Sequence, residues 1–186
     1  GHSHILANTI PNCVSYDPTF AHEVAVIMHD GLKGMVERQE NVFYYITLLN
    51  ENYAMPGLLP GTEEQIIKGM YLCKPGADGD KRVQLLGSGT ILRESLEAQT
   101  LLAADWGVQA DVWSCPSFNE LTREGQDADR WNLLHPLETP RVPFVTRQLG
   151  SRSGPVVAST DYMKAYAEQI RPFVPKGRSY RVLGTD

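Results

Sequence analysis

Two histidines at the start of the chain are its first candidates for chemistry. The sequence opens Gly-His-Ser-His-Ile, so His2 and His4 stand at alternate positions. Alternate side chains of an extended segment point to the same side, and both imidazoles would then face one ligand. Imidazole is neutral or charged near pH 7, which suits proton transfer or hydrogen bonding to a developing charge. From the residues alone, a surface loop or a tag remnant is the favoured alternative.

Two other segments occupy positions where α/β sheets build binding sites. Gly87-Ser88-Gly89 lies between a predicted strand and a predicted helix, where backbone N–H groups can bind an anion. A dinucleotide-binding turn needs a third glycine where this sequence has Leu92, and no Lys-Ser/Thr pair follows, so a structural turn is favoured. The polar stretch at residues 50–53 follows another predicted strand, and a binding loop and a solvated loop are equally favoured there.

Other polar groups favour structural roles. His22 and His29 lack a nearby acidic third ligand, so packing or exposure is favoured over a metal site. The segment 133–143 carries three prolines and is predicted to be irregular. A rigid loop held by ion pairs is favoured there over a ligand site, whose side chains would be Arg130, His135, Glu138 and Arg141.

Composition narrows the class of protein. The chain has 186 residues, 42% hydrophobic and 21% charged, enough for one domain or two small ones. A net charge of −5 disfavours nucleic-acid and anionic-membrane partners, and no apolar run approaches membrane-spanning length. The start does not resemble a signal peptide. The cysteines are odd in number and widely spaced, which favours a reducing cytoplasm: Cys13, Cys73 and Cys115.

The elements that must position these residues centre on one strand, turn, helix and strand unit. Residues 83–86 and 110–115 are apolar or alternating runs typical of strands. Between them, residues 91–104 carry an apolar stripe at helical spacing, and Gly107 is a plausible stop. A right-handed crossover would make the two strands parallel. The predicted fold class is therefore α/β with a mostly parallel sheet.

Before this unit, residues 12–16 and 41–49 are predicted strands, the second of them buried. A helix is predicted to begin at Asp17-Pro18, and a short one to follow Thr62. The proline and glycine stretch at residues 75–80 is the best linker, so domains are predicted at 1–77 and 78–186.

After this unit, a helix is predicted from Ser117 to a stop at Gly125, with one or two more turns at residues 127–134. A strand at 155–158, a helix capped by residues 159–161 and a last strand at 180–183 follow. Because no closing helix follows that strand, the chain is predicted to be a piece of a longer protein.

Six segments of the sequence carry a resemblance to a known family: residues 1–5, 10–18, 49–53, 83–93, 130–143 and 158–164. Together they resemble the homodimeric bacterial pyruvate dehydrogenases, the decarboxylating components of pyruvate dehydrogenase complexes within the transketolase superfamily. The segment at 130–143 is specific to this enzyme type, whereas the glycine turn is shared loosely across the superfamily.

The resemblance implies that residues 1–77 end a pyrimidine-binding domain and that residues 78–186 form a truncated transketolase C-terminal-like domain. Enzymes of this family use thiamine diphosphate and magnesium to decarboxylate pyruvate, then pass the acetyl unit to the lipoyl domain of dihydrolipoyl acetyltransferase. They are cytoplasmic homodimers. Their magnesium-binding Gly-Asp-Gly motif and activating glutamate lie upstream, so the isolated chain is expected to bind no cofactor and to be inactive.

The resemblance also implies roles for the two histidines. His4 matches the position where transketolases carry a substrate-facing histidine, and His2 is adjacent. Both are therefore candidate catalytic residues, His4 before His2. Two alternatives stay open: a transketolase-like enzyme acting on another substrate, and a catalytically silent domain used for subunit contact.

Overall fold

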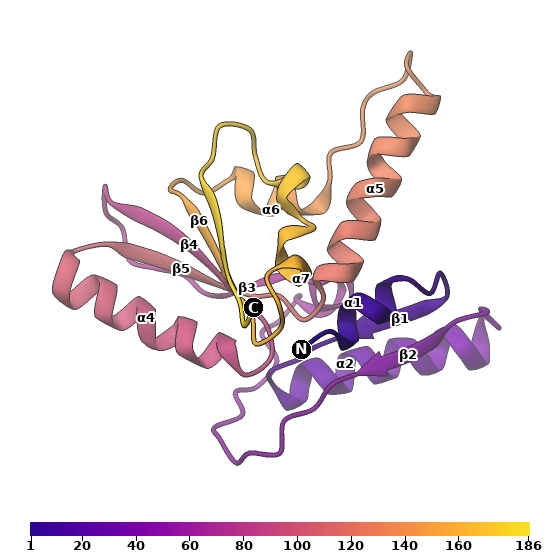
Figure 1. Cartoon of the computed structure of the whole chain (residues 1–186), viewed down its shortest axis with the longest axis horizontal. Coiled ribbons are helices and arrows are strands. Elements are labelled where there is room, and N and C mark those ends of the chain that lie inside the picture. Colours follow the sequence, from indigo (N-terminus) through magenta and orange to yellow (C-terminus); the bar gives the residue numbers. More distant parts are fainter.

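The computed structural model describes residues 1–186 and contains two sheets (Figure 1). The helices are α1 (Ser3–Asn8), α2 (Ala21–Leu32), α3 (Glu63–Lys68), α4 (Ile91–Trp106), α5 (Phe118–Leu134), α6 (Phe144–Gly150) and α7 (Ala165–Glu168). A π-helical turn, η1 (Lys33–Glu37), continues α2, and a 3-10 turn, η2 (Arg171–Phe173), follows α7. The strands are β1 (Cys13–Tyr16), β2 (Phe43–Ile46), β3 (Tyr71–Lys74), β4 (Arg82–Gly87), β5 (Gln109–Ser114), β6 (Val156–Ser159) and β7 (Tyr180–Leu183).

The larger sheet has the strand order β3-β5-β4-β6-β7. Only β3 runs antiparallel, along β5; β4 is parallel to both β5 and β6, and β6 is parallel to β7. Helix α4 packs on β4 and β5, where Leu85, Leu92 and Val112 form a buried cluster. The other face carries the main core, shared with α5, α6 and α7. The α/β fold class and the parallel pairing of β4 with β5 are confirmed.

The smaller sheet pairs β1 with β2 in parallel. Tyr16, Ile27 and Ile66 form its buried cluster with Tyr71, so α2 and α3 are held against β1 and the start of β3. The strand predicted at residues 41–49 is confirmed as β2, but its predicted length and its predicted burial are wrong. Strand β2 spans four residues and pairs on one side only, which leaves Phe43 44% exposed.

The amino-terminal predictions differ from the structure in two places. Residues 3–8 are helical and not extended. Helix α2 begins at Ala21 and not at Asp17-Pro18, because Asp17 turns its carboxylate into the interior, where it accepts a hydrogen bond from Thr47. The Glu23 carboxylate instead accepts hydrogen bonds from the N–H groups of Thr19 and Phe20, which satisfies donors at the start of the helix.

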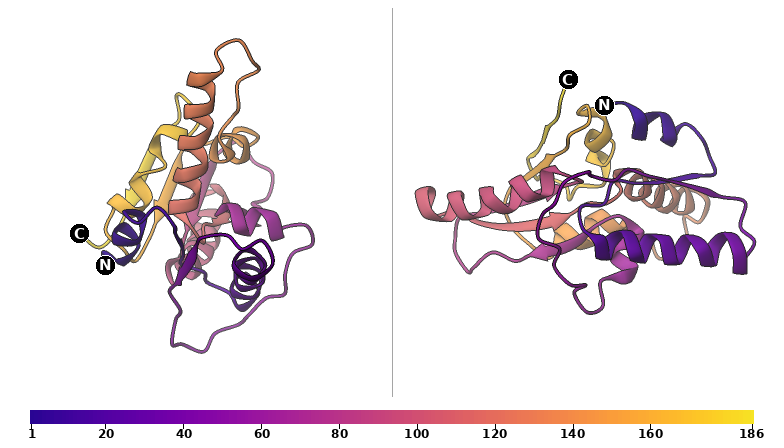
Figure 2. Two further views of the ribbon diagram at one scale, coloured as in Figure 1. Left: turned by 90° about the vertical axis from the view of Figure 1, so that its right-hand side faces the viewer. Right: turned by 90° about the horizontal axis from the view of Figure 1, so that it is seen from below.

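Helix α5 is continuous from Phe118 to Leu134, so the predicted stop at Gly125 is wrong. The reason is packing: a Cβ at Gly125 would lie 2.6 Å from the ring of Phe173. The glycine lets that ring press against the helix, and it does not mark the helix end. The helix projects from the body, and residues 135–143 after it are irregular (Figures 1 and 2). The irregular segment predicted at 133–143 is therefore confirmed except for its first two residues, which are helical.

Two further differences lie in the second half. Helix α6 was not predicted, and the helix expected after residue 161 is reduced to α7 and the 3-10 turn η2, with Pro172 in that turn.

The domain boundary between residues 77 and 78 stays a prediction. Strand β3, which precedes that boundary, pairs with β5 in the larger sheet. The two termini lie close together beside residues 162–164 (Figure 2).

Candidate active site

A buried polar cluster lies where several elements end beside the larger sheet. The turn after β4 supplies Ser88 and Gly89, and Thr160 follows β6, 3.3 Å from Ser88 between the hydroxyl oxygens. From the smaller sheet, Asp17 follows β1 and Thr47 follows β2. The connections of β4 and β6 leave the sheet in different directions at this point, and such switch points are the usual binding sites of open parallel sheets.

His4 joins this cluster through a chain of hydrogen bonds. Its Nε2 atom lies 3.0 Å from the hydroxyl oxygen of Thr47. That hydroxyl donates to Oδ1 of Asp17 over 2.7 Å. One polar chain thereby links His4 to Thr47, 43 positions later in the sequence, and Thr47 to Asp17, 30 positions earlier.

The ring of His4 is enclosed by aromatic side chains. It stacks on Tyr166 with the ring centroids 5.0 Å apart and contacts Tyr162 edge-on at 4.8 Å, with Tyr45 at 5.3 Å. Asn119 donates a hydrogen bond to the backbone carbonyl of His4. His4 is completely buried, and burial lowers its pKa to about 4, so the imidazole is neutral near pH 7.

Asp17 is also buried, and burial raises its pKa to about 6. Its backbone carbonyl accepts a hydrogen bond from the N–H of Gly89, 3.0 Å away. Gly89 has φ +50°, and a Cβ there would lie 2.4 Å from Oδ2 of Asp17. The glycine turn therefore leaves room for a carboxylate of the protein itself, in keeping with the structural interpretation of the turn.

His2 lies outside this cluster. Successive residues of an α-helix are turned by about 100°, so side chains two positions apart point to nearly opposite sides. Because α1 is a helix, His4 is buried while His2, its N-cap residue, is exposed. The structure does not bring both imidazoles to one ligand, and the catalytic roles of His4 and His2 stay predictions.

A second buried network surrounds Glu23, which sequence reasoning missed. Its carboxylate accepts hydrogen bonds from Tyr71 at 2.8 Å and Ser114 at 2.5 Å, besides those from the backbone at the start of α2. His22 lies 3.1 Å from the Tyr71 hydroxyl. The local sequence gives no signal for this network, because Tyr71 and Ser114 come from distant strands.

The polar loop at residues 50–53 is fixed to helix α4. Arg93 pairs with Glu51 at 2.8 Å and lies over the ring of Tyr53, 4.5 Å from its centroid. The Tyr53 hydroxyl donates to the backbone carbonyl of Thr19. Residues 50–52 are nevertheless exposed, so the loop is solvated and held at its Glu51 and Tyr53 side chains.

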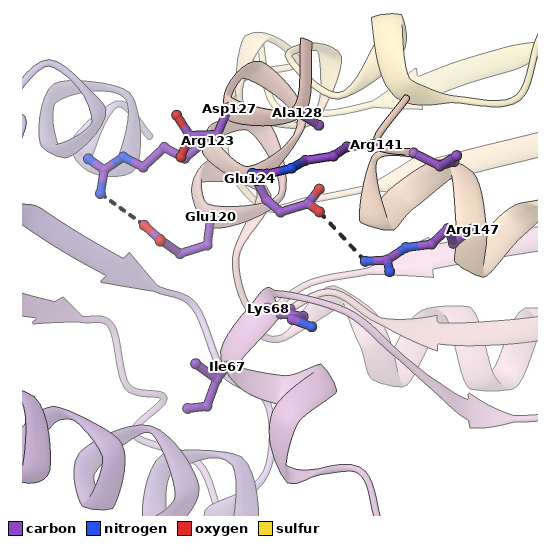
Figure 3. Close-up of a pocket in the computed structure, with 10 residues that line it drawn as sticks. Ile67, Lys68, Glu120, Arg123, Glu124, Asp127, Ala128, Arg141 and Arg147 are labelled. Atoms are coloured by element: carbon purple, nitrogen blue, oxygen red, sulfur yellow. Dashed lines mark hydrogen bonds and ion pairs between the residues drawn. The ribbon is translucent and has the colours of Figure 1, made fainter. Parts of the chain in front are cut away.

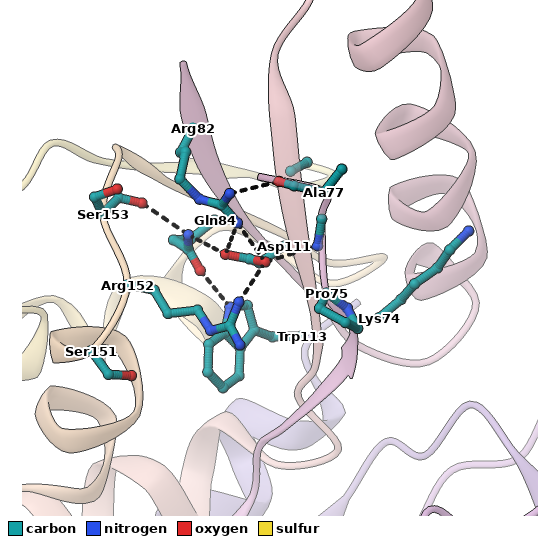
Figure 4. Close-up of polar contacts among 12 residues, drawn as sticks. Lys74, Pro75, Ala77, Arg82, Gln84, Asp111, Trp113, Ser151, Arg152 and Ser153 are labelled. Atoms are coloured by element: carbon teal, nitrogen blue, oxygen red, sulfur yellow. Dashed lines mark hydrogen bonds and ion pairs between the residues drawn. The ribbon is translucent and has the colours of Figure 1, made fainter. Parts of the chain in front are cut away.

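A third network lies around Asp111 (Figure 4). Its carboxylate accepts hydrogen bonds from Arg82, Arg152, Gln84 and the N–H of Gly76. Although burial opposes the charge, these donors hold the pKa of Asp111 below its usual value. The pairs join β4, β5 and the turn before β6, which is a structural role.

The largest cavity, of about 690 Å³, lies between α3, α5 and residues 141–147 (Figure 3). Its charges are nearly balanced: four cationic side chains face three carboxylates, with Arg123 paired to Glu120 at 2.9 Å. Of the side chains predicted around residues 130–141, only Arg141 lines this cavity, and it lies over the Trp131 ring at 4.2 Å. His135 stacks on the same ring. The structure therefore does not gather those four residues into one site.

Solved structures place the fold in a known class. Transketolase from Leishmania mexicana superposes with a TM-score of 0.63 at 14% identity, over 100% of this chain and 22% of that one. Transketolase from Campylobacter jejuni gives 0.57 at 15% identity, over 100% and 23%. At such identities the likeness concerns the fold alone. The chain thus has a transketolase-type α/β fold.

Sequence comparison is more specific. Residues 69–186 match the transketolase-like TK C-terminal domain, and residues 1–56 match the pyruvate dehydrogenase E1 component middle domain. The chain belongs to the transketolase-like C-terminal domain family. It is 60% identical to the pyruvate dehydrogenase E1 component of Escherichia coli K12 and 58% identical to that of Cupriavidus necator. Both alignments cover all of this chain, so the predicted resemblance is confirmed.

The chain spans 21% of the length of each of these relatives. No three His, Cys, Asp or Glu side chains are grouped so that they could hold a metal ion. A magnesium ion held by this chain would therefore have at most two such side chains as ligands. No helix combines the length and apolarity needed to cross a membrane.

Proposed function

We propose that the chain is part of a pyruvate dehydrogenase E1 component, an enzyme that decarboxylates pyruvate and reductively acetylates the lipoyl group of dihydrolipoyl acetyltransferase. The observation that carries this proposal is identity of 58–60% along the whole chain to relatives named for that component. The match of residues 1–56 to its middle domain supports this choice over other transketolase-type enzymes.

Thiamine diphosphate and magnesium are the cofactors of this proposal. By the family resemblance, the magnesium-binding motif and the activating glutamate lie upstream of residue 1, so the isolated chain is expected to be inactive. The division into a middle-domain part, 1–77, and a C-terminal-like domain, 78–186, belongs to the same proposal, as do a homodimeric state and a cytoplasmic location.

Within this enzyme, His4 would contact the substrate or its adduct. Two observations support that role: its place in a polar cluster at a switch point of the sheet, and its neutral state near pH 7. A neutral imidazole has one N–H donor and one nitrogen lone pair, so it can either donate or accept a hydrogen bond. A charged imidazolium has two N–H donors and no lone pair. His2, exposed at the start of α1, would at most lie near the entrance.

Subunit contact is a second candidate role for the same piece. Large apolar side chains are exposed on the smaller sheet and the elements around it, and contiguous apolar surface of this kind usually marks an interface. They include Leu6, Ile10, Val36, Phe43 and Leu48. A role in subunit contact is compatible with a catalytic role in the enzyme. If subunit contact were the sole role, the chain would be catalytically silent.

The test is a substrate comparison with the complete enzyme that contains this chain. With thiamine diphosphate and magnesium, we expect turnover of pyruvate with a lipoylated acceptor domain and none with xylulose 5-phosphate and ribose 5-phosphate. Turnover of the sugar phosphates alone would favour the transketolase-like alternative. Absence of both activities in a folded, cofactor-loaded protein would favour the silent domain.

A further inference from the structure

The hydrogen bonds of the polar chain run in one direction. Thr47 has one hydroxyl proton and two acceptors within reach, Oδ1 of Asp17 at 2.7 Å and the backbone carbonyl of Tyr16 at 3.4 Å. The shorter and charge-assisted bond is the stronger one, so the proton points to Asp17. A carboxylate accepts only, which leaves the Thr47 oxygen as an acceptor toward His4.

This direction determines which nitrogen of His4 carries the proton. Nε2 lies 3.0 Å from the Thr47 oxygen and must donate to it. In a neutral imidazole the other nitrogen then has a lone pair. That atom, Nδ1, is buried and has no hydrogen-bond partner in the protein. Unpaired buried acceptors are rare, and one at a switch point of a sheet is a place for a ligand group to donate.

The burial of Asp17, an ionisable residue, indicates a functional role for its carboxylate. Only 7% of the residue is exposed, and burial disfavours the ionised form. The turn at Gly89 is shaped to admit it, since any side chain there would collide with the carboxylate. Buried ionisable groups retained in this way are concentrated at functional sites.

We propose that Thr47 and Asp17 are positioning residues of the active site, which hold the proton of His4 on Nε2 and thereby present the Nδ1 lone pair to a hydroxyl or proton of the substrate. The inference rests on the proposed function, since it acts through His4. Of the aromatic residues around His4, Tyr45 is 36% exposed, Tyr162 is half-buried and Tyr166 is buried. Substrate therefore approaches His4 past Tyr45 and Tyr162.

The experiment uses steady-state kinetics of the complete, cofactor-loaded enzyme with pyruvate. Thr47→Val keeps the shape of the side chain and removes its hydroxyl, whereas Thr47→Ser keeps the hydroxyl. We expect Thr47→Val to lower kcat about 10²-fold with little change in KM. Thr47→Ser should restore most of that loss, because the hydroxyl again connects Asp17 with His4.

Two further variants separate positioning from mere stability. Thr122→Val removes another buried hydroxyl, one that donates within α5 to the carbonyl of Phe118, and should leave kcat unchanged. The double variant His4→Ala/Thr47→Val should be no slower than His4→Ala alone, because Thr47 acts only through the imidazole. Asp17→Asn should slow the enzyme as Thr47→Val does, since an amide can donate to Thr47 and reverse the direction of the chain.

Two outcomes overturn the inference while the proposed function stands. One is an unchanged kcat in Thr47→Val beside a slow His4→Ala enzyme; the other is a loss in Thr47→Ser as large as in Thr47→Val. If His4→Ala itself is fully active, the role of His4 fails and the inference fails with it. If the parent enzyme does not consume pyruvate, the proposed function is what has failed.

Discussion

At the scale of single residues, His4 and Asp17 carry most of the functional interpretation, and their ionisation has opposite effects on stability. The pKa of His4 is lowered by burial to about 4, and that of Asp17 is raised to about 6. As the pH falls below 6.5, the unfolded chain protonates its histidine first, so the His4 contribution to the free energy of unfolding is lost toward pH 4. As the pH falls through 6, folded Asp17 takes up its proton before the unfolded chain does, so its contribution rises.

The first prediction follows from this opposition. Each shift corresponds to about 3 kcal/mol, and the two nearly cancel between pH 6.5 and 4. Asp17→Asn removes the contribution that rises as the pH falls. The free energy of unfolding of the variant should therefore decrease more steeply on acidification than that of the parent. Urea unfolding of both proteins at several pH values in this range measures the difference. Parallel curves would show that Asp17 does not titrate as described.

The second prediction concerns the turn that admits Asp17. Gly89→Ala places a Cβ in a left-handed backbone conformation and against the carboxylate, whereas Gly107→Ala, at φ +62°, meets nothing within 4 Å. The backbone cost is shared, about 1–2 kcal/mol. We expect Gly89→Ala to lose clearly more free energy of unfolding than Gly107→Ala. Equal losses in urea titrations would mean that the contact with Asp17 costs nothing to disturb.

At the scale of elements, the unit from β4 to β5 was predictable, because its strand, helix stripe and Gly107 stop all agree locally. Helix α5 was not, because a glycine at a helix stop and a glycine under an aromatic ring look alike in sequence. The start of α2 was misplaced for a related reason: Asp17 resembles an N-cap residue but is buried in a contact with Thr47. The polar cluster joins residues far apart in the chain, and spacing alone cannot reveal it. His4 was found by resemblance, whereas Thr47 had no signal.

The third prediction tests the role of Gly125 in α5. In a helix interior, alanine is about 1 kcal/mol more favourable than glycine. At position 125, however, the alanine Cβ would lie 2.6 Å from the Phe173 ring. We expect Gly125→Ala to be net destabilising by about 1–3 kcal/mol, as overpacked core sites are. Gly150→Ala in α6 meets nothing within 4 Å and should be neutral or stabilising. A stabilised Gly125→Ala protein would contradict the assignment of Gly125 to close packing against the Phe173 ring.

At the scale of the whole molecule, the smaller sheet has only two strands and leaves apolar side chains exposed around it. Leu6 is 64% exposed and Leu48 68% exposed. An apolar groove of about 270 Å³ lies between α1 and β2, lined by Leu6, Ile10 and Phe43 among others. Surface of this kind is usually covered by a partner.

The fourth prediction is that the isolated 186-residue chain self-associates at low micromolar concentration, through apolar surface and the unpaired edge of β2. Light scattering coupled to size exclusion should show a species heavier than 20.7 kDa. Leu48→Glu should reduce the association, whereas Leu137→Glu, at a 99% exposed site in the loop after α5, should not. A compact monomer of the parent chain would contradict the assignment of this surface as an interface.

We propose that the cluster around His4 is the part of the active site that this chain supplies. The most direct measurement is kcat for pyruvate of the complete enzyme and its His4→Ala variant, with cofactor affinity measured in parallel. We predict a loss of about 10²-fold to 10⁴-fold in kcat, the usual cost of removing one proton-transfer group, with cofactor affinity retained. An unchanged kcat in a stably folded His4→Ala enzyme would contradict the account.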